Sequence, residues 1–206
     1  MQKPLVTILK TGIANTASVS AAFQRLGAQV ELTDSASVID NAELLVFPGV
    51  GTFGAGMESL RSIGVVEMLA QRIASRAPTL AICLGLQLLC QESEESPGVS
   101  GIGSLDQTPS LFPSNVQSPQ FGWNKVVAPD NAVMLRSGYA YFANSYRIAQ
   151  APSGWLTATS DHGGSFIAAI ESGPVLACQF HPELSGAWGS QLLSAWMTKS
   201  REAVPC

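Results

Sequence analysis

A compact apolar segment, Thr79 to Ile82, runs directly into Cys83 and is followed by a helical pattern that begins near Leu86. A nucleophile at such a sharp turn between strand and helix has an uncommon backbone conformation, and the residues two places before and after it must be small. Ala81 and Gly85 meet that requirement. The segment therefore predicts a strand, a tight turn that presents the Cys83 thiol, and a helix.

The thiol at this turn has two interpretations. The helix that follows would direct the positive end of its dipole at the sulfur and favour the thiolate, which is the reactive form. A cysteine inside an apolar run is more often a small buried hydrophobe, however. Taken alone, the segment around Cys83 favours this second interpretation, so its function depends on the rest of the chain.

Strand and helix patterns alternate along the first half of the chain. Patterns typical of strands cover Leu5 to Leu9, Gln29 to Thr33 and Glu43 to Phe47, and a helical spacing of apolar residues covers Ser18 to Leu26. Further helical patterns continue to about Arg76. Such alternation is typical of a parallel sheet with helices on both faces, and the expected fold class is therefore α/β.

The second half of the chain has a different pattern. Joins rich in proline, glycine and serine separate short runs with β character, and an amphipathic helix closes the chain. We predict an antiparallel β section here, within a single domain that spans residues 1–206. The expected strands lie near Asn124 to Val127, Tyr139 to Tyr146, Leu156 to Ser160, Ser165 to Glu171 and Val175 to Phe180.

Composition argues against several classes of protein. Of 206 residues, 46% are apolar and only 13% are charged, which opposes disorder and indicates that a partner covers part of the surface. The net charge is -4 without a basic cluster, so we expect no nucleic acid or acidic membrane as partner. No apolar run approaches the roughly 18 residues of a membrane-spanning helix.

The four cysteines are Cys83, Cys90, Cys178 and Cys206, and none forms a C-x-x-C pair. This spacing fits neither a disulfide framework nor a zinc site. Free thiols are typical of reducing compartments, so we expect a cytoplasmic protein that binds no metal.

A histidine and a carboxylate near the end of the chain could serve such a cysteine. The chain has two histidines, and Glu183 follows one of them, His181, by two residues. In an extended chain the two side chains project to the same side, so the carboxylate can hold one imidazole nitrogen while the other faces a sulfur. A strand-end histidine beside a solvated glutamate explains the segment equally well. His162 precedes two glycines and fits a turn residue.

A glycine-containing loop, Pro48-Gly49-Val50-Gly51, follows the apolar strand that ends at Phe47. Its backbone N–H groups can turn toward a ligand, as acyl transfer requires for the developing oxyanion. The loop lacks the Lys-Ser/Thr of a phosphate-binding loop and is not a G-x-G-x-x-G motif with a suitable acidic residue. An ordinary turn from strand to helix is the alternative interpretation.

The three segments are weak indicators singly but fit one design. The carboxyl ends of parallel strands meet at one edge of a sheet, where ligands bind. The loop, Cys83 and His181 would each follow a different strand to that edge. The sequence therefore predicts an acyl-transfer site with Cys83 as nucleophile, His181 as base and Glu183 as the group that orients it.

The same segments carry a resemblance to a known family. Pro48-Gly49-Val50-Gly51, Cys83-Leu84-Gly85-Leu86-Gln87 and Gln179-Phe180-His181-Pro182-Glu183 resemble the three signature segments of class I glutamine amidotransferases. Phe121-Gly122-Trp123-Asn124 and Tyr141-Phe142-x-x-Ser145-Tyr146 are similar to segments of the glutaminase subunits of imidazole glycerol phosphate synthases. The resemblance covers nearly the whole chain.

The resemblance implies a reaction and a partner. Cys83 would attack the carboxamide of glutamine, while His181 would protonate the departing ammonia and then activate water, oriented by Glu183. The ammonia would pass to a (β/α)8-barrel cyclase in a heterodimer that serves histidine biosynthesis, with no metal or organic cofactor. The resemblance also assigns the oxyanion hole to the N–H groups of Val50 and Leu84, and glutamine binding to Gly49, Gly51, Gln87, Ser145 and Tyr146.

Four places depart from the family pattern, and three alternatives stay open. Near the N-terminus, Ala14-Asn15-Thr16-Ala17-Ser18-Val19 stands where the family usually has Gly-Asn followed by Ser-Val. Phe121, Asn144 and Leu184 stand where the family usually has Met, His and Lys. We expect these changes to alter how the subunit senses its cyclase. The alternatives are a glutaminase for pyridoxal phosphate or purine synthesis, a cysteine hydrolase or peptidase, and a non-catalytic partner-binding module. The Phe121 segment opposes a glutaminase for pyridoxal phosphate or purine synthesis. Gln87 favours capture of an amide and so opposes a hydrolase or peptidase. The complete triad opposes a non-catalytic module. Without the partner, we expect weak glutaminase activity.

Overall fold

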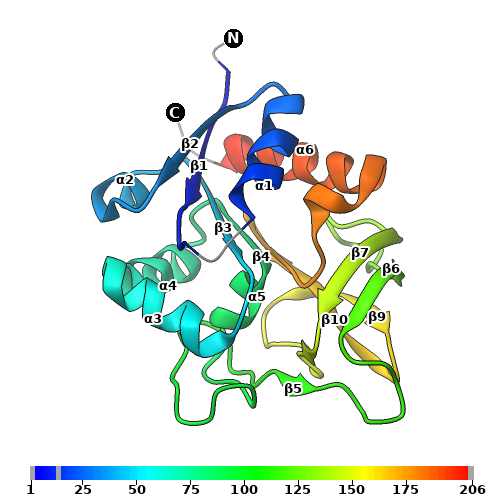
Figure 1. Ribbon diagram of the computed structural model, residues 1–206. Coiled ribbons are helices and arrows are strands. Elements are labelled where there is room, and N and C mark those ends of the chain that lie inside the picture. Colours follow the sequence, from blue (N-terminus) through cyan, green and yellow to red (C-terminus); the bar gives the residue numbers. More distant parts are fainter. Residues whose placement is uncertain (1–2, 13–14, 204–206) are drawn as a thin grey trace.

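The computed structural model describes residues 3–12 and 15–203, so Cys206 lies outside it. A seven-stranded sheet in the order β2-β1-β3-β4-β11-β10-β9 runs through the protein (Figure 1). The first five strands in that order are parallel, and β11, β10 and β9 pair antiparallel. The sheet consists of β1 (Leu5–Leu9), β2 (Gln29–Thr33), β3 (Leu44–Gly49), β4 (Thr79–Cys83), β9 (Leu156–Asp161), β10 (Ser165–Ser172) and β11 (Val175–Cys178).

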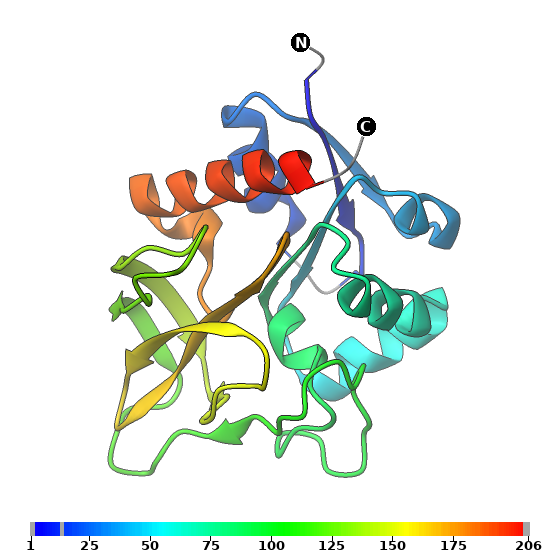
Figure 2. The ribbon, with the colours of Figure 1, turned by 180° about the vertical axis from the view of Figure 1, so that it is seen from behind.

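Helices cover both faces of this sheet, as the alternation in the sequence predicted (Figures 1 and 2). Because side chains alternate along a strand, Leu44 and Val46 of β3 point into one core, and Leu45 and Phe47 point into the other. The first core contains α1 (Thr16–Arg25) and α6 (Gly186–Ala203), and the second contains α2 (Ala36–Asp40), α3 (Phe53–Ile63), α4 (Val66–Ala74) and α5 (Leu84–Leu88). Every residue of β3 and β4 is buried between these layers.

The apolar face of the closing helix α6 packs into the first core, as its amphipathic pattern predicted. Its Leu192 and Trp196 are buried, and the Trp196 ring meets Phe23 of α1 edge-on with centroids 5.9 Å apart. In the part of the chain that the structure describes, no helix is long and apolar enough to cross a membrane.

The second half adds two small antiparallel pairs to the main sheet. One pairs β6 (Gln120–Val126) with β7 (Gly138–Asn144), and the other pairs β5 (Ser110–Leu111) with β8 (Tyr146–Arg147). The predicted antiparallel section is therefore confirmed. A backbone hydrogen bond of 2.9 Å from the His181 N–H to the Tyr141 carbonyl oxygen joins β7 to the segment after β11.

Several predicted boundaries were wrong. The strand before the glycine loop continues through Pro48 to Gly49; its ladder with β1 ends at Val46, so the proline lies beyond that ladder. The helix after Cys83 begins at once, at Leu84 rather than Leu86. The predicted strand Val175 to Phe180 ends at Cys178, and it is antiparallel to β10 but parallel to β4. The short helix α2 was not predicted.

Candidate active site

Cys83 lies between β4 and α5 with φ 55° and ψ −111°. A positive φ is strained for a residue with a side chain, and it persists only where the surroundings enforce it. Gly85 permits this turn, because a Cβ at this position would overlap the carbonyl oxygen of Phe47. The turn from strand to helix is the one that the small residues around Cys83 predicted.

His181 and Glu183 form a buried pair. Nδ1 of His181 lies 2.8 Å from Oε1 of Glu183, and the two side chains are 8% and 2% exposed. The prediction that an extended chain brings the carboxylate to the ring was wrong. Pro182 and Glu183 belong to the 3-10 turn η1 (Pro182–Leu184). The turn still brings the two groups together.

The environment of His181 favours its protonated form. Burial alone lowers the pKa of the ring, but hydrogen bonds and charge interactions with Cys83 and Glu183 raise the pKa further than burial lowers it, to about 10. At neutral pH the imidazolium therefore predominates beside the sulfur. Such a ring can give a proton to a leaving group.

Adjacent strands bring the predicted segments to one edge of the sheet. Gly49 at the end of β3 pairs with Cys83 at the end of β4, and Cys178 at the end of β11 pairs with Ile82. The glycine loop and the segment that leads to His181 therefore leave the sheet on either side of β4, the strand that ends at Cys83. His162 lies in the turn between β9 and β10.

His162 contacts other groups there. Its Nε2 is 2.7 Å from the Gln117 carbonyl oxygen, and its ring packs edge-on against Phe112 with centroids 4.9 Å apart. The turn role predicted for His162 fits these contacts.

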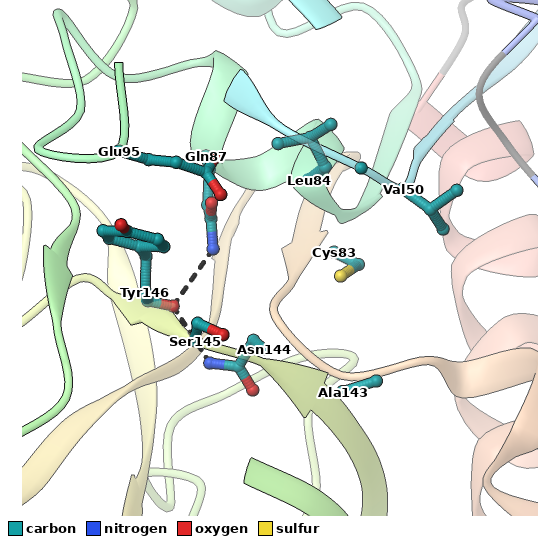
Figure 3. Close-up of a pocket in the computed structure, with 10 residues that line it drawn as sticks. Val50, Cys83, Leu84, Gln87, Glu95, Ala143, Asn144, Ser145 and Tyr146 are labelled. Carbon is teal, nitrogen blue, oxygen red and sulfur yellow. Dashed lines mark hydrogen bonds between the residues drawn. The ribbon is translucent and has the colours of Figure 1, made fainter. Parts of the chain in front are cut away.

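A cavity of about 140 Å³ opens beside Cys83 (Figure 3). His181 and Glu183 are not among the residues that line it. Gly49 is not among them either; a Cβ there would come within 3.0 Å of the Leu84 Cβ, so Gly49 lets the loop lie close against the turn. The lining residues are Val50, Gly51, Cys83, Leu84, Gln87, Glu95, Ala143, Asn144, Ser145 and Tyr146, which include seven of the predicted site residues.

Glu95 is a cavity residue that the sequence reasoning missed. Its Oε2 accepts a hydrogen bond of 2.6 Å from the Phe53 N–H, and the neighbouring Ser96 Oγ accepts one of 3.0 Å from Gly54 N–H. These bonds join the loop that carries Glu95 to the first turn of α3. The sequence contained a signal for this residue, because Glu92, Glu94 and Glu95 form an acidic cluster in a chain with few charges.

Of the positions that depart from the family pattern, Ala14 lies outside the described residues, Asn144 lies beside Cys83, and Leu184 lies next to Glu183. Asn144 lines the cavity, and its Nδ2 donates a hydrogen bond of 3.0 Å to the Tyr146 carbonyl oxygen. Leu184 follows the buried Glu183 and is itself exposed. Among residues 3–12 and 15–203, no group of three or more His, Cys, Asp or Glu side chains could hold a metal ion.

Comparisons with known proteins give a family. Residues 7–199 match the family described as Glutamine amidotransferase class-I. A protein of Renibacterium salmoninarum named Imidazole glycerol phosphate synthase subunit HisH is 39% identical in an alignment of 208 positions that covers 93% of this chain and 93% of that protein. A protein of Arabidopsis thaliana named Imidazole glycerol phosphate synthase hisHF, chloroplastic, is 36% identical over 200 residues, which cover 94% of this chain and 34% of the plant protein.

A solved structure titled Crystal structure of glutamine amidotransferase superposes with a TM-score of 0.76 at 18% identity, over 95% of this chain and 98% of that one. Identity this low shows a common fold alone. The family match and the relatives of higher identity carry the assignment further. The chain belongs to the class I glutamine amidotransferase family and, within it, to the family of imidazole glycerol phosphate synthase subunits HisH.

Proposed function

We propose that this chain is the glutaminase subunit of an imidazole glycerol phosphate synthase, and that it hydrolyses glutamine to glutamate and ammonia for histidine biosynthesis. The observation that carries the proposal is the strained turn of Cys83, beside the buried pair of His181 and Glu183 and at the edge of a cavity. The family description supports glutamine as the substrate, and the relatives' names support the synthase.

In this proposal the reaction follows from the positions of three groups. Cys83 Sγ attacks the carboxamide carbon of glutamine, and the protonated His181 gives its proton to the nitrogen as the C–N bond breaks. Ammonia leaves and a thioester remains on the sulfur. The neutral His181 then takes a proton from water, whose oxygen attacks the thioester and releases glutamate. Glu183 holds Nδ1 and so directs the other ring nitrogen to the reacting atoms.

Backbone N–H groups would stabilise the oxyanion of each tetrahedral intermediate. Leu84 begins α5, where the first N–H groups of a helix lack partners within the helix. Val50 lines the same cavity, on the loop that Gly49 brings close to the turn. We assign both N–H groups to the oxyanion hole.

The cavity fits a free amino acid. Figure 3 shows Glu95 on the left, near Gln87 and Tyr146, and Cys83 to the right of these side chains. The Glu95 carboxylate would pair with the α-ammonium group of glutamine while the glutamine carboxamide lies at the sulfur. A peptide substrate has no such ammonium group at an internal glutamine, so Glu95 favours a glutaminase over a cysteine peptidase. Gly51, Gln87, Ser145 and Tyr146 would form the remaining contacts.

The outer face of the β6–β7 pair is the surface that we assign to the cyclase partner. Phe121, Trp123 and Tyr139 are 67%, 58% and 61% exposed, and the strand register puts all three on one face, which we call the aromatic hairpin face. Phe121 pairs with Ala143, which lines the cavity. A partner on this face would therefore lie next to the source of ammonia.

The plant relative supports such a partner. This chain spans 34% of a protein that is named as a whole synthase, so most of that protein is additional sequence. We propose that this chain forms a heterodimer with a separate (β/α)8-barrel protein, which supplies the cyclase activity. Cys83, Cys90 and Cys178 are free thiols, which supports a reducing, cytoplasmic location.

A coupled assay tests the proposal. The chain is combined with the barrel cyclase and its ribulosyl formimino-carboxamide nucleotide, and synthesis is followed with glutamine or with ammonium as nitrogen donor. Cys83→Ser should abolish glutamine-dependent synthesis and keep ammonium-dependent synthesis. Cys90→Ser, at another buried thiol, should keep both. Retained glutamine-dependent synthesis in Cys83→Ser would refute the proposed nucleophile.

A further inference from the structure

Two side-chain amides, those of Gln179 and Gln87, connect the Cys83 sulfur to Tyr146, the first residue of β8. Nε2 of Gln87 donates to the Tyr146 carbonyl oxygen at 3.1 Å and to Oε1 of Gln179 at 2.9 Å. Nε2 of Gln179 donates to Sγ of Cys83 at 3.8 Å. Asn144 also donates to the Tyr146 carbonyl oxygen, and the two bonds to that oxygen are drawn in Figure 3.

The Tyr146 carbonyl determines which end of each amide faces its neighbour. The two ends of a glutamine amide look alike in shape, so their assignment depends on the hydrogen-bond partners. A carbonyl oxygen only accepts, and Gln87 must therefore present its nitrogen to Tyr146. The same nitrogen faces Gln179, which must present its oxygen there. The nitrogen of Gln179 is left to face the sulfur.

Hydrogen bonds of the backbone and of the side chain fix the position of Gln179. It directly follows β11, where Cys178 pairs with Ile82, so it comes level with Cys83 at the end of the neighbouring strand. Its backbone N–H donates to the Ala168 carbonyl oxygen at 2.8 Å, and its side chain is fully buried. A donor held in this way is already oriented when charge develops on the sulfur.

We propose that Gln179 is a further catalytic residue, whose side-chain N–H holds the Cys83 sulfur and favours its thiolate; this rests on the proposed function, in which Cys83 is the nucleophile. A hydrogen bond to a charged acceptor is stronger than one to a neutral acceptor, so the donor favours the thiolate over the thiol. His181 would supply the proton for the leaving group, and Gln179 a fixed dipole at the attacking atom.

A role in packing alone makes a different prediction. Gln179 could simply fill the space between the sheet and the β6–β7 pair, and methionine, which has a similar length and no donor, would then replace it with little effect on Cys83. Glutamate would keep the oxygen that accepts from Gln87 and would place a second oxygen against the sulfur. The two substitutions therefore separate the roles.

Alkylation of Cys83 by iodoacetamide tests the inference on the isolated full-length chain, with the modified peptide identified by mass. The rate is measured over a range of pH. Gln179→Glu should slow alkylation at neutral pH by about tenfold or more and move its pH profile to higher pH. Gln179→Met should slow it by about threefold or more, because the donor is lost but no negative charge is added.

Gln120→Glu is the matched control. Gln120 is another buried glutamine, 5% exposed, on β6, and its exchange should leave the alkylation rate within about twofold of the parent rate. Thermal unfolding of each variant identifies any that fails to fold. If Gln179→Glu does not fold, the alkylation rate of Gln179→Met tests the inference. Parent-like rates and pH profiles in the folded Gln179 variants would overturn the inference. A failure of the proposed function would instead appear as retained glutamine hydrolysis in Cys83→Ser.

Discussion

Gly85 leaves free the space into which the carbonyl oxygen of Phe47 projects, so that the turn at Cys83 packs directly against the backbone of β3. A methyl group at residue 85 would have to displace this backbone, which cannot move without disturbing the ladder between β3 and β4, where Phe47 pairs with Ala81. The glycine thereby links the strained conformation of Cys83 to the centre of the fold.

Gly85→Ala should therefore destabilise the protein by about 1–3 kcal/mol, the usual cost of overpacking a filled core. It should also lower glutamine hydrolysis, because the turn cannot keep its geometry. Urea unfolding measures the first effect, and glutamate release with the cyclase present measures the second. Unchanged stability and unchanged activity would show that the backbone of β3 adapts to the methyl group without loss.

The pH dependence of stability should carry a contribution from His181. Its folded-state pKa of about 10 lies above the value near 6.5 of an unfolded chain. A raised pKa means that the folded protein binds the proton more tightly, so the contribution is complete below about 6.5 and is lost as the pH rises through about 10. The urea midpoint of the parent protein should therefore fall as the pH is raised from about 6.5 to about 10.

The matched variant for that measurement is His181→Asn. It removes the titrating ring, and the fall in midpoint across the same window should become smaller than in the parent. Cys83→Ser should reduce it as well, because hydrogen bonding and charge interaction with Cys83 contribute to the raised pKa of His181. Equal slopes in all three proteins would contradict the assignment.

Glu95→Gln tests the proposed contact with the α-ammonium group. Loss of the negative charge should raise the KM for glutamine by about tenfold or more and change kcat less, since the contact lies away from the reacting atoms. Glu94→Gln is the control, because Glu94 binds the Leu111 N–H and does not line the cavity. A similar KM in Glu95→Gln and the parent would assign Glu95 to loop structure alone.

Trp123→Ala tests the aromatic hairpin face. Truncation of a large aromatic residue at the centre of an interface typically costs about 2 kcal/mol or more of binding energy, so affinity for the cyclase should fall by about 30-fold. Titration calorimetry with the purified cyclase gives the comparison. Leu32→Ala, at an exposed position on the edge strand β2, should leave affinity unchanged. Equal affinities in both variants would place the interface elsewhere.

The sequence by itself determined the local parts of this protein. β1 and β2 have the predicted ends, because the apolar pattern that marks each strand lies within a few neighbouring residues. The turn at Cys83 was predictable for the same reason, since the small residues that it requires lie within two positions of it. Alternating strand and helix patterns likewise determined the α/β class.

Only the tertiary structure decided how distant residues meet. The contacts of Gln179 with Cys83 and with Gln87 span 96 and 92 residues, and no local pattern marks them. Glu95 reaches the cavity because its loop is hydrogen-bonded to α3, 42 residues earlier in the chain. Periodicity reports which face of an element is buried, whereas the partner on that face depends on strand order and loop path. The turn at Cys83 was thus predictable from the sequence, and the contact of Gln179 with the Cys83 sulfur was not.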